Sequence, residues 1–347
     1  MTRTNSLISE AAALMDGFAS RGRRYLWTDA YAVTNYLALA NITQEPRWQK
    51  AALDLVESVH HVLGRHRPDD ARRGWISGLS DHDGERHPTQ GGLRIGKPLR
   101  ERLVTEDYDP DLEWERDGQY FHYLTKWMHA LGELARAADR PIFLTWAREL
   151  AAFAHGAFTD GPSWNRRMFW KISIDGARPL VRSMGQHDPL DGYVTCVELD
   201  AWADALSVDR EPSLVEATTD FERMLEQMNP TTADPLGLGG LLTDAGRLEA
   251  LGGHEALVSE LREHALLGIE TFMDAPDLRL PANRRLAFRE LGLAIGLGEG
   301  PLADEITAFW REPAHRRAAT WTDHEDINDV MLATSLLSRG SPGNGYV

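Results

Sequence analysis

The chain has 347 residues, 42% of them hydrophobic, and its 53 acidic and 37 basic side chains give a formal net charge of −16 at pH 7. This length allows either two domains or one large barrel. The negative charge repels phosphate backbones and anionic lipid, so we expect neither nucleic acid nor a membrane surface as a partner. The sequence contains no run of 18 or more apolar residues, which argues against a transmembrane helix.

The cysteine content points to the cellular compartment. The lone thiol, Cys196, cannot form an internal disulfide, and the N-terminus does not show the pattern of a secretory signal. We therefore expect a cytoplasmic protein.

Helical patterns of two kinds alternate along the chain. One kind has apolar residues at i, i+3, i+4 and i+7 with charge on the other face, which is typical of a surface helix. The other is apolar on most of its circumference, which is typical of an interior helix. In chain order the pattern predicts outer 7–20, inner 29–40, outer 46–63, inner 117–131, outer 141–157, inner 191–206, outer 213–228, inner 237–248, outer 255–273, inner 285–297, outer 301–310 and inner 326–337.

This strict alternation predicts six helical hairpins whose inner members form one barrel, an all-α (α/α)6 toroid. We expect a single domain over residues 1–340, a frayed tail at 341–347 and negligible β structure. The small residues Gly292, Ala294, Gly296 and Gly298 favour close approach of inner helices, because such contacts need positions without bulk. A general helical bundle or solenoid is the alternative architecture.

Two connections, 64–111 and 158–190, are much longer than the others. Loops of this length in a compact domain are usually functional or disordered, and their apolar and aromatic content favours ordered loops. Both loops lead into the N-terminal ends of inner helices. We therefore expect them at one mouth of the barrel.

Acidic and aromatic residues gather ahead of the inner helices, at 27–29, 114–117, 187–191 and 321–326. With the alternating helices, this arrangement resembles the six-hairpin glycosidase-like superfamily over nearly the whole chain. The resemblance implies a substrate funnel where the inner helices begin, and carbohydrate chemistry. In several glycosidases of this superfamily the general acid precedes the third inner helix and the base the sixth. By position, this implies Asp188 as acid and Asp323, Glu325 or Asp326 as base.

The residues around Asp188 support its selection independently. The segment Met184-Gly185-Gln186-His187-Asp188-Pro189 is dense in polar groups just before an apolar helix, and such groups are costly to bury without a ligand. A pair of carboxyl groups is also what glycoside hydrolysis requires. The alternative is helix capping, which would suit Asp29, Asp117, Asp191 and Asp326 in particular.

Further residues are predicted to bind the substrate. Tryptophans at the mouth would stack on sugar rings, although tryptophans also fill gaps between helices. Polar residues at i, i+3, i+4 and i+7 of the second inner helix (Gln119, His122, Tyr123 and Lys126) form one face that needs partners. The predicted binding residues are Trp27, Asp29, Trp75, Trp114, Glu115, Asp117, Gln119, Tyr120, His122, Gln186, Arg284 and Trp321.

The long loops are also rich in arginine, which would attract an anionic substrate such as a uronate or a sugar phosphate. Alternatively, these arginines pair with neighbouring acids, among them Glu101 and Glu106. No metal is expected, because the histidines and acids of these loops lack ligand spacing, and no cofactor, because the glycines at 91–96 do not form a dinucleotide fingerprint.

Three functions remain open from the sequence. The first is a glycoside hydrolase acting on a small or oligosaccharide substrate. The second is a sugar epimerase or isomerase in which His187 and His324 transfer protons. The third is a non-catalytic toroid that binds a ligand in its hollow.

Overall fold

The computed structural model describes residues 3–339, and these are mostly helical, so the all-α class is confirmed. The tail predicted at 341–347 lies outside the described residues. Contacts divide the chain into two compact units. Unit 1 takes the residues up to Arg21, Thr34–Gln49 and those from Asn229 on, and unit 2 takes Gly22–Val33 and Lys50–Met228. None of the helices within 3–339 is long and apolar enough to span a bilayer.

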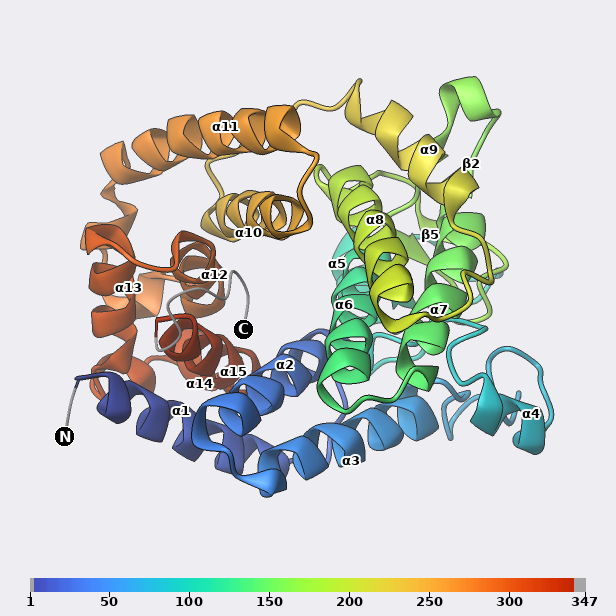
Figure 1. The fold of residues 1–347 in the computed structure, drawn as a ribbon, viewed down its shortest axis with the longest axis horizontal. Coiled ribbons are helices and arrows are strands. Elements are labelled where there is room, and N and C mark those ends of the chain that lie inside the picture. Colours follow the sequence, from blue (N-terminus) through green and yellow to red (C-terminus); the bar gives the residue numbers. More distant parts are fainter. Residues whose placement is uncertain (1–2, 340–347) are drawn as a thin grey trace. The chain divides into compact units, whose positions relative to one another are not determined.

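Unit 2 is built around four long helices. α6 packs against α7 and α8, and α8 packs against α9 (Figure 1). α2 (Leu26–Thr43) and α3 (Pro46–Leu63) run from one unit into the other. The remaining elements of unit 2 are α4 (Asp81–Arg86), α5 (Pro110–Glu115), β1 (Gln119–Tyr120), α6 (Phe121–Ala137), α7 (Ile142–Phe158), β2 (Thr159–Asp160), η1 (Ser163–Asn165), β3 (Arg167–Met168), β4 (Lys171–Ile172), β5 (Pro179–Val181), α8 (Asp188–Leu206) and α9 (Val215–Leu225).

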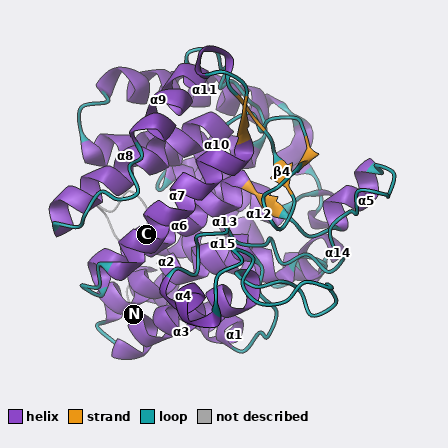
Figure 2. Ribbon diagram, turned by 90° about the vertical axis from the view of Figure 1, so that its right-hand side faces the viewer, coloured by secondary structure: helices purple, strands orange, loops and turns teal. Residues whose placement is uncertain are grey.

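Short strands tie the long loops of unit 2 to the start of α6. β1, β4 and β5 form an antiparallel sheet in the order β1-β4-β5, with Gln119 opposite Ile172, and β2 pairs with β3. Figure 2 shows the strands in orange, with β4 labelled. The Gln119 side chain accepts a hydrogen bond from the Leu93 amide at 3.0 Å and donates to the Gly91 and Ile174 carbonyls at 3.1 and 2.8 Å. Gln119 was predicted on a helical face. It lies in β1 instead, where its amide joins the two loops.

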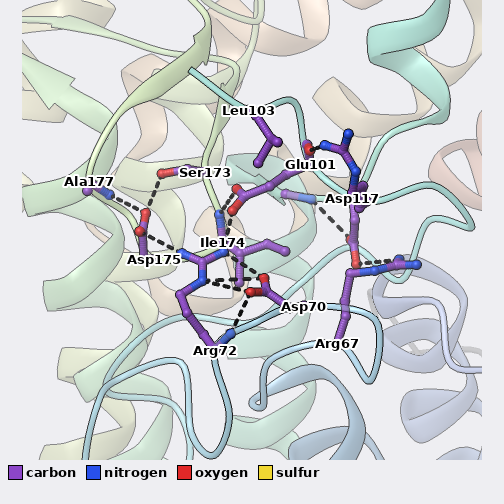
Figure 3. A network of polar contacts seen from close by, with 12 residues as sticks. Arg67, Asp70, Arg72, Glu101, Leu103, Asp117, Ser173, Ile174, Asp175 and Ala177 are labelled. Atoms are coloured by element: carbon purple, nitrogen blue, oxygen red, sulfur yellow. Dashed lines mark hydrogen bonds and ion pairs between the residues drawn. The ribbon is translucent and has the colours of Figure 1, made fainter. Parts of the chain in front are cut away.

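Ion pairs also connect the loop at 64–111 with the loop at 158–190. Arg72 contacts three carboxylates, those of Asp70, Glu101 and Asp175 (Figure 3). The second carboxylate oxygen of Glu101 accepts the Ile174 amide at 2.8 Å. The alternative in which loop arginines pair with neighbouring acids therefore applies here.

Asp117 is the buried centre of this loop structure. Its Oδ2 accepts from Arg94 Nη1 at 2.5 Å and from Arg67 Nη1 at 3.4 Å, and its Oδ1 accepts three backbone amides, those of residues 96, 97 and 118. The Asp117 side chain is fully buried. Its carboxylate thus satisfies loop donors and does not cap the following helix, which begins four residues later.

Unit 1 is also helical. α10 packs against α11 and α12, α12 against α13 and α15, and α1 against α15. Its elements are α1 (Arg3–Ala19), α10 (Pro235–Leu251), α11 (Glu255–Asp274), η2 (Pro276–Arg279), η3 (Ala282–Arg284), α12 (Ala287–Leu297), α13 (Pro301–Arg311), η4 (His315–Arg317), α14 (Ala319–Thr322) and α15 (Glu325–Leu337).

Glycines let α10 and α12 touch through their backbones. A Cβ on Gly239 would lie 2.0 Å from the Gly292 carbonyl oxygen, and one on Gly296 would lie 2.4 Å from the Gly239 carbonyl oxygen. No side chain fits at such distances. The expected close approach is confirmed between α10 and α12 at Gly292 and Gly296, whereas nothing lies within 4 Å of a Cβ built on Gly298.

Several helix starts differ from the prediction by a few residues. α2 begins at Leu26 and α8 at Asp188, each three residues before the expected start. Pro189 in the first turn explains the early start of α8, because proline has the φ of a helix and needs no donor there. α6 begins late, at Phe121, because residues 119–120 pair with β4 first.

The central position of Asp117 predicts a large effect on stability. Asp117→Ala leaves Arg94 buried without its carboxylate, so we expect it to lower the free energy of unfolding by roughly 3–5 kcal/mol. Asp111→Ala, at an exposed position in α5, is the matched control and should change it by less than about 0.5 kcal/mol. Urea unfolding of both variants measures this. Equal stabilities would show that Asp117 does not hold the loops.

Candidate functional site

Asp188 occupies the first residue of α8 and is buried, with 4% of its surface exposed. Its carboxylate turns back to the preceding loop, where Oδ2 accepts the Gly185 amide at 3.0 Å. Gly185 leaves no room for a side chain, because a Cβ there would lie 2.4 Å from Asp188 Oδ2. α8 has no side-chain cap at its N-cap residue, His187. The geometry therefore places Asp188 as an anchored carboxyl group and not as the cap of α8.

Three acid–base pairs join α6 and α8. His122 Nδ1 lies 3.8 Å from Asp188 Oδ1, Lys126 Nζ lies 2.8 Å from Asp191 Oδ1, and His129 Nδ1 lies 2.8 Å from Glu198 Oε2. Along the three pairs, the residue numbers increase on α6 and on α8 in the same direction. The two helices are therefore parallel, and their first turns lie at the same end.

Burial sets the charge of the first pair. Desolvation raises the pKa of Asp188 to about 7, with a smaller contribution from the nearby Asp191 carboxylate. Desolvation also lowers the pKa of His122 to about 4. Both shifts favour the uncharged forms, so a carboxyl group that keeps its proton near neutral pH faces an uncharged imidazole.

Aromatic rings surround His122. Tyr120 stacks on the imidazole with ring centroids 5.5 Å apart, and Tyr123 meets it edge-on at 4.8 Å. Trp170, from the loop between β3 and β4, lies 6.2 Å from the imidazole and 5.0 Å from Trp114. We call His122, Tyr120, Tyr123, Trp114 and Trp170 the aromatic cluster. Trp114 keeps 44% of its surface exposed, which leaves part of the cluster open to solvent.

The start of α2 extends this cluster. Tyr25 and Tyr123 share a hydrogen bond of 2.5 Å between their hydroxyl groups. Trp27 packs against Tyr123 and Tyr31, with ring centroids 6.4 and 5.0 Å away. Burial raises the pKa of Tyr123 well above its usual range, so its hydroxyl stays protonated. Trp27 itself is 7% exposed and contacts the aromatic cluster through Tyr123.

Other predicted residues of unit 2 have structural partners. Asp29 is fully buried in the first turn of α2, where it accepts the Tyr25 amide at 2.9 Å and faces Arg24 at 3.4 Å. Asp29 was considered as an N-cap residue. It lies within the first turn of α2 instead, and its carboxylate accepts the amide of the residue that precedes the helix. Trp75 is buried under Arg65, whose guanidinium lies 4.4 Å from its ring.

The remaining predicted residues of unit 2 lie near helix starts. Glu115 ends α5 and is exposed, and Gln186 is exposed in the loop before α8. His187 precedes Asp188 directly and is half-buried. These three residues are accessible, in contrast to Asp117 and Gln119, whose side chains are occupied by the loops.

Six predicted residues belong to unit 1. Glu325 and Asp326 begin α15 and pair with Arg21, which also bonds Asp329 at 2.7 Å. Glu325 and Asp326 therefore lie in the first turn of α15, and both carboxylates are paired with the guanidinium of Arg21. The other four residues are Asp323, His324, Arg284 and Trp321. Asp323, His324 and Arg284 are exposed, and the His324 ring lies 6.3 Å from that of Phe288. Trp321 is buried, and its ring lies 5.7 Å from that of Trp310.

Some residues of the site were not among those predicted. Tyr123 and Trp170 belong to the aromatic cluster, Tyr25 bonds to Tyr123, and Lys126 and Asp191 form the second pair. The spacing of His122, Tyr123 and Lys126 on one helical face was a usable signal for two of them. Tyr25 and Trp170 come from distant segments and had no such signal.

The described residues do not bring together three or more histidine, cysteine, aspartate or glutamate side chains in an arrangement that could hold a metal ion. Cys196 is buried inside α8, and burial raises the pKa of its thiol to about 12. A thiol in this state is unreactive. Asp188 and His122 are thus the paired side chains at the site whose pKa values burial shifts toward the uncharged forms.

The shifted pKa of Asp188 predicts a pH-dependent stability difference. Because the folded-state value of about 7 exceeds the usual 3.8, Asp188 loses its stabilising contribution as the pH rises from about 4 through 7. His122 shows the opposite shift and largely offsets this loss in the wild type below about pH 6.5. Asp188→Asn removes only the first effect. We therefore expect this variant to gain stability relative to wild type between pH 4 and 8, by on the order of 4 kcal/mol.

Denaturant unfolding of both proteins at pH 4, 6 and 8 measures the difference. Asp204→Asn, at the exposed end of α8, is the control and should show no such trend. A constant difference between wild type and Asp188→Asn across these pH values would contradict the proposed protonation of Asp188.

Comparison with protein-family models, with curated proteins and with solved structures gave no match for this chain. The function is therefore inferred from the side chains at the starts of α6 and α8.

Proposed function

We propose that this chain is a carbohydrate-active enzyme, a glycoside hydrolase in which Asp188 is the general acid. The observation that carries this proposal is the buried Asp188 carboxyl group held 3.8 Å from His122 beneath a partly exposed aromatic cluster. General acids of glycosidases need a carboxyl group that keeps its proton near neutral pH, and burial in an apolar setting provides it.

The surroundings of Asp188 suit a sugar. Aromatic rings offer flat apolar faces for the C–H groups of a sugar ring, and Trp114 and Trp170 lie 5.0 Å apart at the open side of the cluster. The hydroxyl group of Tyr120 has no hydrogen-bond partner within the described residues. That hydroxyl group is buried, so a sugar would pair with it only after the rings of the aromatic cluster shift.

A neutral sugar fits better than an anionic one. Arg72, Arg94, Arg100 and Arg102 of the loop at 64–111 all pair with carboxylates, those of Asp70, Asp117, Glu106 and Glu113 among them. Their charges are largely neutralised before any substrate arrives. We therefore propose a neutral glycoside in place of the anionic substrate considered from the sequence.

Hydrolysis needs a second carboxyl group. Asp323, Glu325 and Asp326 stay the proposed candidates, on the positional grounds of the sequence resemblance. The resemblance also implies the finer fold, a single (α/α)6 toroid. The parallel start of α6 and α8 and the glycine contact of α10 with α12 support that architecture. A cytoplasmic location is part of the same proposal, supported by a single buried thiol.

A second candidate is a sugar epimerase or isomerase. The observation that favours it is the imidazole of His122 held 3.8 Å from the carboxyl group of Asp188, because epimerisation needs two groups beside one carbon that exchange protons. In that enzyme His122 would act in place of the sequence-predicted pair His187 and His324. Deuterium uptake from solvent into a sugar C–H bond would identify epimerisation, whereas new reducing ends would identify hydrolysis.

A leaving-group comparison tests the role of Asp188. A general acid matters for a poor leaving group, such as the sugar of a disaccharide, and little for p-nitrophenolate, which leaves without a proton. We expect Asp188→Asn to lower kcat/KM for disaccharides by roughly 10²- to 10⁴-fold and to affect p-nitrophenyl glycosides much less. The measurement is a panel of both substrate types across several neutral sugars.

Asp204→Asn makes the same chemical change on the same helix, at an exposed position, and should retain wild-type activity on both substrate types. An equal loss for both substrate types in Asp188→Asn would assign Asp188 to structure. A wild-type protein inactive on the whole panel would favour a non-catalytic toroid.

Gly185 tests the position of the carboxyl group without removing it. Gly185→Ala places a methyl group 2.4 Å from Asp188 Oδ2, so the carboxyl group must move. We expect a loss of roughly 10-fold or more in kcat/KM for disaccharides, because small displacements of catalytic groups are costly. Gly156→Ala in α7, where nothing lies within 4 Å of the added methyl group, should leave activity unchanged. Full activity in Gly185→Ala would argue against a catalytic Asp188.

A further inference from the structure

A separate pocket of about 250 Å³ opens in unit 2, and the proposed hydrolysis makes no use of it. α3 lines one side, α7 lines another, and the segment from Trp75 to Pro88 closes it. We call it the α3–α7 pocket. Ligand pockets in proteins commonly have volumes of about 300 Å³ or more. The α3–α7 pocket is slightly smaller, so its ligand must be a small molecule.

The walls of the α3–α7 pocket are aromatic. Trp146 lies edge-to-face with His60 at 5.2 Å and with Phe143 at 5.3 Å between ring centroids. Its indole Nε1 donates to the Arg86 carbonyl at 2.8 Å, which fixes the ring. His61 and Trp75 continue the wall, with ring centroids 6.0 Å apart.

His60 contributes no positive charge to this wall. Trp127 Nε1 donates to His60 Nε2 at 3.2 Å, which requires an unprotonated nitrogen. Burial also lowers the pKa of His60 to about 3. The pocket therefore presents an uncharged imidazole beside the indole of Trp146.

The rim of the pocket carries acidic side chains. Asp54 pairs with Lys50, and Glu85 pairs with His61 at 2.8 Å. Glu57, one turn after Asp54 on α3, is exposed and makes no hydrogen bond or ion pair within residues 3–339. A carboxylate at the rim thus remains available to a ligand.

The lining rings already accept cations. The guanidinium of Arg65 lies 4.4 Å from the centroid of Trp75, and that of Arg140, which also lines the pocket, lies 4.9 Å from Phe143. A cation over an aromatic face is attracted by the ring quadrupole, and the attraction grows as water is excluded. Arg65 and Arg140 occupy the faces of Trp75 and Phe143, so the part of the lining that favours a further positive charge is Trp146 with the unpaired carboxylate of Glu57.

We propose that the α3–α7 pocket binds a small organic cation, with its charged end against Trp146 and beside Glu57. The pocket belongs to unit 2 alone, and neither Asp188 nor the aromatic cluster contributes to its lining. Binding there is separate from the proposed hydrolysis and needs no turnover to be detected.

Choline and its neutral isostere 3,3-dimethylbutan-1-ol test the charge requirement. Isothermal titration of the full chain should show saturable binding of choline, and binding of the isostere weaker by roughly three-fold or more. Equal affinity for both compounds, or no saturable binding of choline, would overturn the proposal.

Matched variants locate the site. Glu57→Gln should weaken choline binding by about three- to five-fold, the effect expected of one exposed carboxylate. Glu260→Gln makes the same change on α11, outside the pocket, and should bind as wild type does. Trp146→Leu should weaken binding further, and Trp146→Phe, which keeps a ring, should weaken it less. Unchanged affinity in Glu57→Gln and Trp146→Leu would place the bound choline elsewhere and overturn the proposal.

Discussion

The parallel contact between α6 and α8 is the constraint on which the candidate site depends. Gly132 lets the two helices approach, since a Cβ there would lie 2.1 Å from the Trp202 ring, and the acid–base pairs set the register. The pairs higher along the helices are close, at 2.8 Å, whereas His122 and Asp188 at the open end are 3.8 Å apart. Of the three acid–base pairs between α6 and α8, the pair of His122 and Asp188 is therefore the one without a direct hydrogen bond.

Much of the fold follows from the periodicity of apolar residues. The twelve expected segments correspond to long helices, and the all-α class is confirmed, whereas their closure into one (α/α)6 toroid stays a prediction. The first residues of the helices were harder to predict than the helices themselves. Pro189 and the pairing of Gln119 with Ile172 each move the start of one helix by a few residues, and the apolar periodicity does not record such local effects. The strands could not be predicted, since two or three residues are too few to show an alternating pattern.

The candidate site was predictable where a local signal existed. The polar segment before α8 pointed to Asp188, and the polar face of the preceding long helix, α6, pointed to His122. Asp29 and Asp117 fit the composition of a helix start equally well, yet one bonds inside its own helix and the other bonds Arg94 across two loops. Composition cannot separate these cases, because the partner residues are brought together only by folding.

The paired arginines of the loop at 64–111 also affect how a substrate arrives. With Arg72, Arg94 and Arg100 each bound to a carboxylate, little positive charge remains to draw anions through a field set by a net charge of −16. Electrostatic steering depends steeply on ionic strength, whereas the diffusion of an uncharged molecule does not. Encounter with a neutral sugar would then proceed at the same rate in dilute buffer and in concentrated salt.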